Sequence, residues 1–173
     1  MAGEAEKGKS PLSDLIAIDP GSTSGFVVLR SEDGSLFWAE ELNLYDVIAK
    51  LSGWLKSTTT STGVVYEQFR LYGGGVGQSK TFSDLPEVRI IGQIEYLCKA
   101  YEREVASVGA GVYKTATAQW LPPKELKGPH QKDAWRLGMW YHVVRLKGKA
   151  TITLKNGRVY SMNVTEAEHE EVT

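Results

Sequence analysis

The sequence predicts one α/β domain with a mixed central sheet flanked by helices and a C-terminal β-hairpin appended to it. Its length of 173 residues fits a single ordinary domain. Its apolar content of 42% is enough for a buried core. Short apolar runs alternate with segments of helical periodicity, which is typical of an α/β protein.

The first three predicted strands form a meander. Residues 1–13 are small and polar and are expected to be a flexible arm. Residues 15–18 form a short apolar run that ends at Asp19, which predicts a buried strand with a carboxylate at its end. Strands are expected at 25–30 and 35–40, joined through Asp33-Gly34, a strong two-residue turn signal.

Helices and strands then alternate. Apolar residues recur every three or four positions over 44–55, which predicts an amphipathic helix that ends in the Ser/Thr run at 57–62. Residues 64–66 predict a buried strand that ends at Glu67. A glycine-rich loop leads from there to a long apolar-striped helix over 85–101, whose wide apolar face could be core or a dimer interface.

The C-terminal half completes the sheet and adds a hairpin. A short strand is expected at 105–108, a short helix at 112–121, and a last helix from Pro129, a residue suited to a first helical turn, to about 146. Residues 152–164 predict a hairpin about Asn156-Gly157, the favoured residues of a type I′ turn.

Charge is distributed unevenly along the chain. The formal net charge is −1, but residues 105–158 carry ten Lys or Arg and only two acidic side chains. The last residues, 166–173, are an acidic tail with four glutamates, which hides the basic region in the total. The expected boundaries are therefore a catalytic domain at 14–147, the appended hairpin at 148–165 and this tail.

The sequence also predicts a soluble, cytoplasmic protein with no membrane partner. No apolar run is long enough for a signal peptide or a membrane span. The single cysteine, Cys98, excludes an intrachain disulfide, and it lies among apolar residues at helical spacing. We expect it to be a small buried hydrophobe rather than a nucleophile, because no partnering base is nearby in the sequence.

Three carboxylates follow predicted elements that can meet at one edge of the sheet. Asp19 and Glu67 each end a buried strand, and Asp133 lies in the first turns of the last helix. Three negative charges brought together repel one another, and a divalent cation relieves the repulsion. Oxygen-only ligation favours Mg²⁺ or Mn²⁺ over zinc, for which the chain lacks thiols and paired imidazoles.

Two further features support a site at this edge. His130 precedes Asp133 by three residues, so on a helix both side chains share one face, and the imidazole could be a ligand, base or proton shuttle. Glycines in the turn from Asp19 to Gly25 keep bulk away from an approaching phosphate or metal, and Ala134 with Gly138 would let the last helix approach the sheet closely.

Each of these residues also has an ordinary structural interpretation. Asp-Pro-Gly is a common surface turn, and Glu67 could be a solvated strand end. Asp133 could merely favour the positive end of a helix dipole, and a lone His130 could be structural. The metal site is predicted by the four residues together, in this order and on these element ends.

These segments resemble the RuvC-like Holliday junction resolvases, and more closely those encoded by phages, within the RNase H-like superfamily. The resemblance rests on IAIDPGSTSGFVVL from Ile16, VVYEQF from Val64, IIGQIEYL from Ile90 and HQKDAWRLGMWY from His130. It spans roughly residues 15–144. The Asp-x-Gly strand recurs across the superfamily, whereas the complete series with His-x-x-Asp-Ala is much narrower.

The resemblance implies an RNase H-like fold and a homodimer that nicks two opposed strands of a four-way DNA junction, in DNA recombination and repair. It implies two Mg²⁺ ions per site, with Mn²⁺ as a substitute and no small-molecule cofactor. Asp19, Glu67 and Asp133 match the acidic ligands, and His130 matches the fourth position. A cytoplasmic, nucleoid-associated location in a bacterial or phage-infected cell is implied as well.

The DNA contacts come partly from the resemblance and partly from charge. Phe69 matches the family's aromatic residue that meets unpaired bases at the crossover, and Tyr72 is a second match. Arg70 and Lys80 flank the glycine-rich loop beside the site and are expected to contact substrate. Phosphate contacts are also expected from the following basic residues of the third quarter: Lys114, Lys124, Lys127, Lys132, Arg136, Lys147 and Lys149.

Other functions stay open at this point. The chain could be an RNase H-like nuclease for structured RNA or another branched DNA, or a branched-DNA-binding module without turnover. The segment DPGSTSG also resembles the phosphate hairpin of actin-like sugar kinases and ATPases, which need a second lobe with its own Asp-Gly phosphate loop. The glycine-rich insertion at 73–77 and the hairpin depart from the bacterial resolvase pattern.

Overall fold

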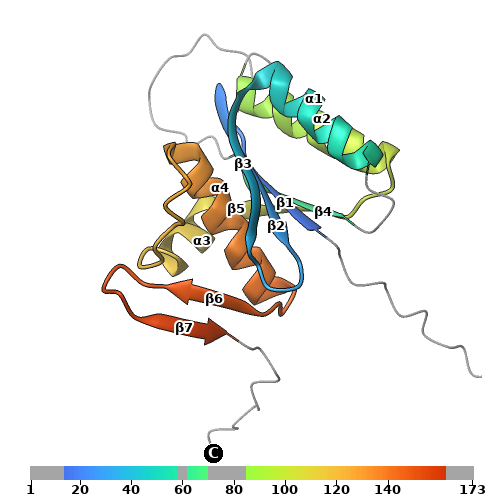
Figure 1. Ribbon diagram of the computed structural model, residues 1–173. Helices are drawn as coiled ribbons and strands as arrows, with labels where there is room; N and C mark the ends of the chain where they lie inside the picture. Colours follow the sequence, from blue (N-terminus) through green and yellow to red (C-terminus); the bar gives the residue numbers. More distant parts are fainter. Residues whose placement is uncertain (1–13, 58–61, 70–84, 163–173) are drawn as a thin grey trace, which may run out of the picture.

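The computed structural model describes residues 14–57, 62–69 and 85–162, in which the elements follow the predicted order (Figure 1). The predicted arm and acidic tail lie outside this part. The strands of the main sheet are β1 (Asp14–Asp19), β2 (Thr23–Arg30), β3 (Leu36–Asn43), β4 (Gly63–Gln68) and β5 (Val105–Gly109). The helices are α1 (Leu44–Ser57), α2 (Pro86–Ala100), α3 (Ala110–Ala116) and α4 (Pro129–Trp140), continued by a π-helix, η2 (Tyr141–Arg145). A hairpin of β6 (Ala150–Thr153) and β7 (Val159–Met162) follows.

The five-stranded sheet is mixed, as predicted. Its order is β3-β2-β1-β4-β5. The meander pairs antiparallel, whereas β1–β4 and β4–β5 are parallel. Strand β1 is central and all six of its residues are buried, because helices cover both faces of the sheet.

The sheet separates two apolar cores. Helices α1 and α2 cover one face, and α3, α4 and the hairpin cover the other (Figure 1). Side chains alternate along β1, so Ile16 and Ile18 pack toward α1 and α2, while Leu15 and Ala17 pack toward α4. The same alternation places the side chain of Asp19 on the α4 side.

Helix α4 lies very close to the sheet, as its small residues predicted. A Cβ on Gly138 would be 2.8 Å from the Cβ of Ala17 and 2.9 Å from Leu29 Cδ1, closer than real Cβ contacts. Ala134 is fully buried in the same contact. The missing side chain at Gly138 therefore sets how closely the helix can pack against β1 and β2.

Helix α2 uses its apolar face for the core. Ile90, Ile94 and Cys98 are all fully buried against the strands and α1, so these side chains are core residues. Burial raises the pKa of the Cys98 thiol to about 11, and the Glu95 charge acts in the same direction. The prediction of Cys98 as a buried hydrophobe is confirmed.

Several boundaries differ from the predictions for physical reasons. Strand β3 continues to Asn43, beyond the predicted end, because it pairs with the whole of β2. Helix α3 ends at Ala116, since Trp120 forms a β-bridge with Leu154 and so belongs to the hairpin layer. No helix in the described ranges is long and apolar enough to span a membrane.

Both predicted tight turns are wrong in type. The N–H of Arg30 donates to the carbonyl of Ser35, so the β2–β3 connection is longer than two residues, with Gly34 at φ 68°. In the β6–β7 turn Gly157 has φ 81°, but Asn156 is not in the left-handed region that a type I′ turn requires. The N–H of Gly157 donates to Leu154, which is the pattern of a type I turn followed by a left-handed glycine.

Candidate active site

The four predicted site residues lie at one edge of the sheet. Ile18 of β1 pairs in parallel with Tyr66 of β4, so the next residues, Asp19 and Glu67, are neighbours at the carboxyl ends of these strands. The first turns of α4 add His130 and Asp133 from the face above. His130 Nδ1 is 2.9 Å from Asp19 Oδ2, which joins the helix to the central strand.

A lysine connects the other two carboxylates. Lys114 Nζ of α3 lies 3.1 Å from Glu67 Oε2 and 3.2 Å from Asp133 Oδ2. Burial lowers the pKa of this ammonium, but the hydrogen bonds and charges of the two carboxylates more than compensate, so its pKa is raised. Lys114 was predicted as a phosphate contact; its position makes it the cation of the carboxylate cluster.

Glu67 has a second partner that the sequence did not reveal. The hydroxyl of Tyr113, which is fully buried, donates to Glu67 Oε2. Burial raises the pKa of Tyr113 strongly, and the hydrogen bond to Glu67 raises it further, so the phenol stays protonated and keeps donating. Tyr113 therefore fixes the orientation of the Glu67 carboxylate.

Asp19 is the most buried of the three carboxylates. It is 8% exposed, and this burial is the main cause that raises its pKa to about 6. The hydrogen bond from His130 opposes the shift, the nearby Glu67 charge adds to it, and the Lys114 charge opposes it. A carboxylate with such a pKa binds either a proton or a cation more readily than an exposed aspartate does.

Gly25 allows α4 to reach this edge. It pairs with Asp19 across β1 and β2, and a Cβ at this position would be 1.9 Å from the carbonyl oxygen of His130. The atom in the way belongs to the helix backbone, so a side-chain rotation cannot relieve the overlap. The glycine in the predicted turn segment is thus required by the docking of α4.

Glu41 is a site residue that sequence reasoning missed. It pairs with Gly25 on β3, and its Oε1 accepts a 2.9 Å hydrogen bond from the backbone N–H of His130. The helix begins after Gly128, which has no side chain to cap it, so a carboxylate from a distant strand serves instead. A Cβ on Gly128 would be 1.9 Å from Glu41 Oε1, which excludes a larger residue there. The signal was the period-two alternation of Ala39 and Glu41, had the strand been extended far enough.

The donor set has the chemistry of a Mg²⁺ site. It offers carboxylate oxygens and one imidazole, the ligands that hard divalent cations accept. Among the described residues, however, no three His, Cys, Asp or Glu side chains are grouped so that one ion could join them. The ammonium of Lys114 lies between Glu67 and Asp133, so this part of the cluster is organised around a positive charge.

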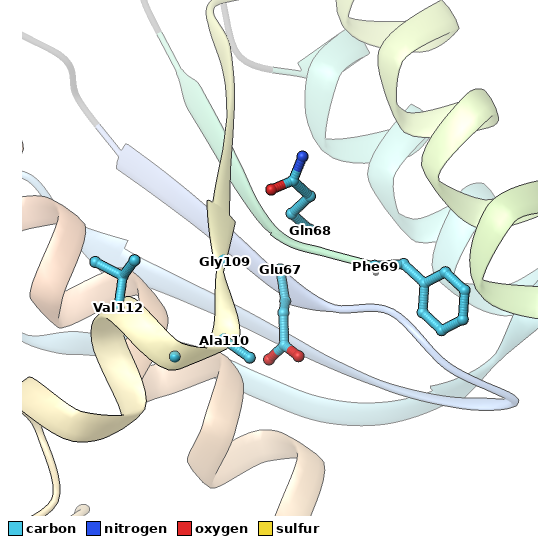
Figure 2. Close-up of a pocket in the computed structure, with 7 residues that line it drawn as sticks. Glu67, Gln68, Phe69, Gly109, Ala110 and Val112 are labelled. Atoms are coloured by element: carbon cyan, nitrogen blue, oxygen red, sulfur yellow. The ribbon is translucent and has the colours of Figure 1, made fainter. Parts of the chain in front are cut away.

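Phe69 lies next to the carboxylates. It lines a pocket together with Glu67, Gln68 and the Gly109–Val112 segment that joins β5 to α3 (Figure 2). Figure 2 shows Glu67 and Gln68 projecting to opposite sides of β4, with the Phe69 ring beyond them. The ring is half-buried, so one surface of it is available beside Glu67.

The other predicted DNA contacts vary in position. Arg136 NH1 is 3.0 Å from Asp133 Oδ1, so it holds that carboxylate, and Lys132 is half-buried on the same helix. Arg70, Tyr72 and Lys80 lie outside the described residues. The remaining predicted phosphate contacts are exposed: Lys124, Lys127, Lys147 and Lys149.

Comparisons with known proteins support the fold. No protein-family model matches the sequence, and no curated protein sequence matches it. Among solved structures, RuvC from Thermus thermophilus in complex with a Holliday junction substrate is similar, with a TM-score of 0.57 and 16% identity over 77% of this chain and 95% of that one. A second structure of Thermus thermophilus RuvC gives a TM-score of 0.58 at 16% identity, over 77% and 96%. The predicted RNase H-like fold is thus confirmed.

Proposed function

We propose that this protein is a metal-dependent endonuclease that resolves four-way DNA junctions by paired, symmetric nicks. The observation that carries the proposal is the gathering of Asp19, Glu67, His130 and Asp133 at one sheet edge, on a fold similar to that of RuvC. One similar structure is a complex of RuvC with a Holliday junction substrate, which is the substrate we propose here.

Asp19, Glu67 and Asp133 would hold two Mg²⁺ ions, with Mn²⁺ as a substitute, and His130 would be a further ligand or a proton carrier. Such ions, when bound, neutralise charge on a scissile phosphate and activate water. The Asp19 carboxylate accepts from Nδ1–H of His130, which leaves Nε2 as the proton acceptor of this half-exposed ring. Lys114 would follow the phosphate when cations replace it between the carboxylates.

Three residues would bring DNA to this edge. Phe69 would stack on an unpaired base at the crossover beside Glu67. Lys132 and Arg136 would hold phosphates along α4. Two opposed nicks need two active sites, so we propose a homodimer whose two-fold axis matches that of the junction.

A junction-cutting assay tests this function. Purified protein is incubated with an end-labelled four-way junction or a linear duplex of the same sequence, with Mg²⁺ or with EDTA, and the nicks are mapped on all strands. We expect nicks at symmetric positions of the junction only, and only with Mg²⁺. Cutting of the linear duplex at equal rate, or of a matched RNA junction in preference, would refute the assignment.

A branched-DNA-binding module without turnover is the second candidate. Lys114 between Glu67 and Asp133 favours it, because a lysine can neutralise the cluster permanently. In that case the protein would bind the junction in the same assay and leave it intact at every Mg²⁺ and Mn²⁺ concentration.

A further inference from the structure

The β6–β7 hairpin carries a concentrated positive charge. Residues 146–162 contain Lys147, Lys149, Lys155 and Arg158 and no Asp or Glu. All four basic side chains are exposed, two at the root of the hairpin and two at its tip. Within the described part of the chain none of the four takes part in a salt bridge. Their charge is therefore directed to solvent rather than used within the domain.

The outer face of the hairpin is made of small side chains, most of them with hydroxyls. Ile152 points into the core, so Thr151 and Thr153 point outward. Residues opposite each other on paired strands share a face, which adds Ser161 opposite Thr151 and Val159 opposite Thr153. Ser and Thr hydroxyls bond DNA phosphates and bases, and no aromatic or long side chain among these four keeps a duplex at a distance.

The hairpin is held rigidly where it joins η2. The buried ring of His142 donates from Nε2 to the carbonyl of Lys149 at 2.9 Å. A Cβ on Gly148 would be 2.1 Å from this ring, so only glycine fits there. Beyond the root, the backbone N–H of Leu121 donates to Thr153, which joins β6 to the segment after α3. The charged face is thus fixed in direction relative to α4.

The hairpin lies on the same side of the sheet as the candidate active site. It packs into the core that includes α3 and α4, and it follows the C-terminal end of α4, whereas His130 is near the start (Figure 1). Twelve residues of helix span about 18 Å. At about 3.4 Å per base pair, DNA that runs from the site along α4 meets the hairpin roughly five base pairs away.

We propose that the outer face of the β6–β7 hairpin binds the backbone of a duplex arm, as a β-ribbon beside or within the groove. A two-stranded β-ribbon fits the major groove, and exposed lysine and arginine attract phosphates. A second copy of this chain is a poorer occupant, because pairing β7 with β7 would bring two basic ribbons together. This inference rests on the proposed function, since it assigns a contact to an arm of the junction.

The test compares junctions with short and long arms. Binding is measured in the Asp19→Asn background, so that no cutting occurs, on junctions with loop-capped arms of about five base pairs and on junctions with arms of about twenty. The tip variant is Lys155→Gln with Arg158→Gln. The matched control is Lys56→Gln with Lys99→Gln, which removes the same charge from exposed positions on α1 and α2, behind the sheet.

We expect the tip variant to lose affinity for long arms only. Each phosphate contact adds about 0.9 to the slope of log K against log salt, so two lost contacts should make the drop in affinity between 50 and 200 mM salt about tenfold smaller. The control should keep the parental slope on both junctions.

Three results would overturn the inference: an unchanged slope, an equal change on short and long arms, or a change of oligomeric state in sedimentation that accompanies the loss. Failure of the proposed function would look different. In that case the Asp19→Asn parent itself would bind junctions no better than linear duplexes, and the variants would still be compared on duplexes of about five and twenty base pairs.

Discussion

The substitution Gly25→Ala tests how α4 is held over the sheet edge. The new Cβ would lie 1.9 Å from the His130 carbonyl oxygen and 2.3 Å from its carbonyl carbon, whereas ordinary contact begins near 3.4 Å. The first turn of α4 must therefore withdraw by about 1.5 Å. That displacement is large enough to break the 2.9 Å hydrogen bond between His130 and Asp19.

The expected loss has two parts. Overpacking typically costs about 1–3 kcal/mol, which for a chain of this size lowers Tm by about 2–12 °C. A catalytic group misplaced by about 1 Å can cost roughly 100-fold in rate. Thermal unfolding followed by circular dichroism measures the first, and single-turnover nicking of a four-way junction measures the second.

Gly53→Ala is the matched control. Gly53 lies in the exposed part of α1, and a Cβ there has nothing within 4 Å. Alanine in a helix interior is favoured over glycine by about 0.5–1 kcal/mol, so this variant should unfold at a slightly higher temperature and nick at the wild-type rate. A Gly25→Ala protein that matches the wild type in both Tm and nicking would refute the described docking of α4.

Three other predictions concern the same edge. Because its folded-state pKa is raised to about 6, Asp19 stabilises the fold below pH 4 and loses this contribution as the pH rises through 6; Asp19→Asn should therefore raise Tm in EDTA at pH 7, by up to about 3 kcal/mol of unfolding free energy, with a gain that vanishes below pH 4 and with cleavage abolished. A Tm gain that does not depend on pH would contradict this. Glu41→Ala should cost about 1 kcal/mol and slow nicking, since the His130 N–H loses its acceptor, whereas Glu41→Gln should largely restore both in urea unfolding and nicking assays. Equal defects in the two variants would exclude the capping role. Phe69→Ala should reduce nicking of a junction about tenfold or more while its gel-shift affinity falls less, consistent with the about 1–3 kcal/mol of one stacked base; a loss confined to binding would count against stacking at the crossover.

The order and type of the elements could be predicted because they depend on local pattern. The apolar run before Asp19 and the helical stripe of α1 are visible in sequence, and strand ends and helix starts converge at a sheet edge by simple topology. Small residues four apart in α4 also predicted its close approach to the sheet. For the same reason the gathering of the four site residues could be predicted from their positions at the ends of these elements.

The partners of these residues could not be predicted, because they come from segments far apart in the chain. The hydroxyl of Tyr113 reaches Glu67, and Lys114 reaches both Glu67 and Asp133, only because α3 follows β5 directly at that edge. Glu41 depends on the exact end of β3, the least certain feature of a predicted strand. The turn about Gly157 was mistaken since the same dipeptide serves two turn types.

The burial of Cys98 offers a practical route to spectroscopy on this molecule. It is the only cysteine, and with a thiol pKa of about 11 its reactive thiolate amounts to about one molecule in ten thousand at pH 7. A fluorophore or spin label would therefore attach selectively to a cysteine introduced elsewhere, without first removing the native thiol. Asn156→Cys, at the exposed hairpin tip, would let energy transfer to a dye-labelled oligonucleotide report how near the two come in solution.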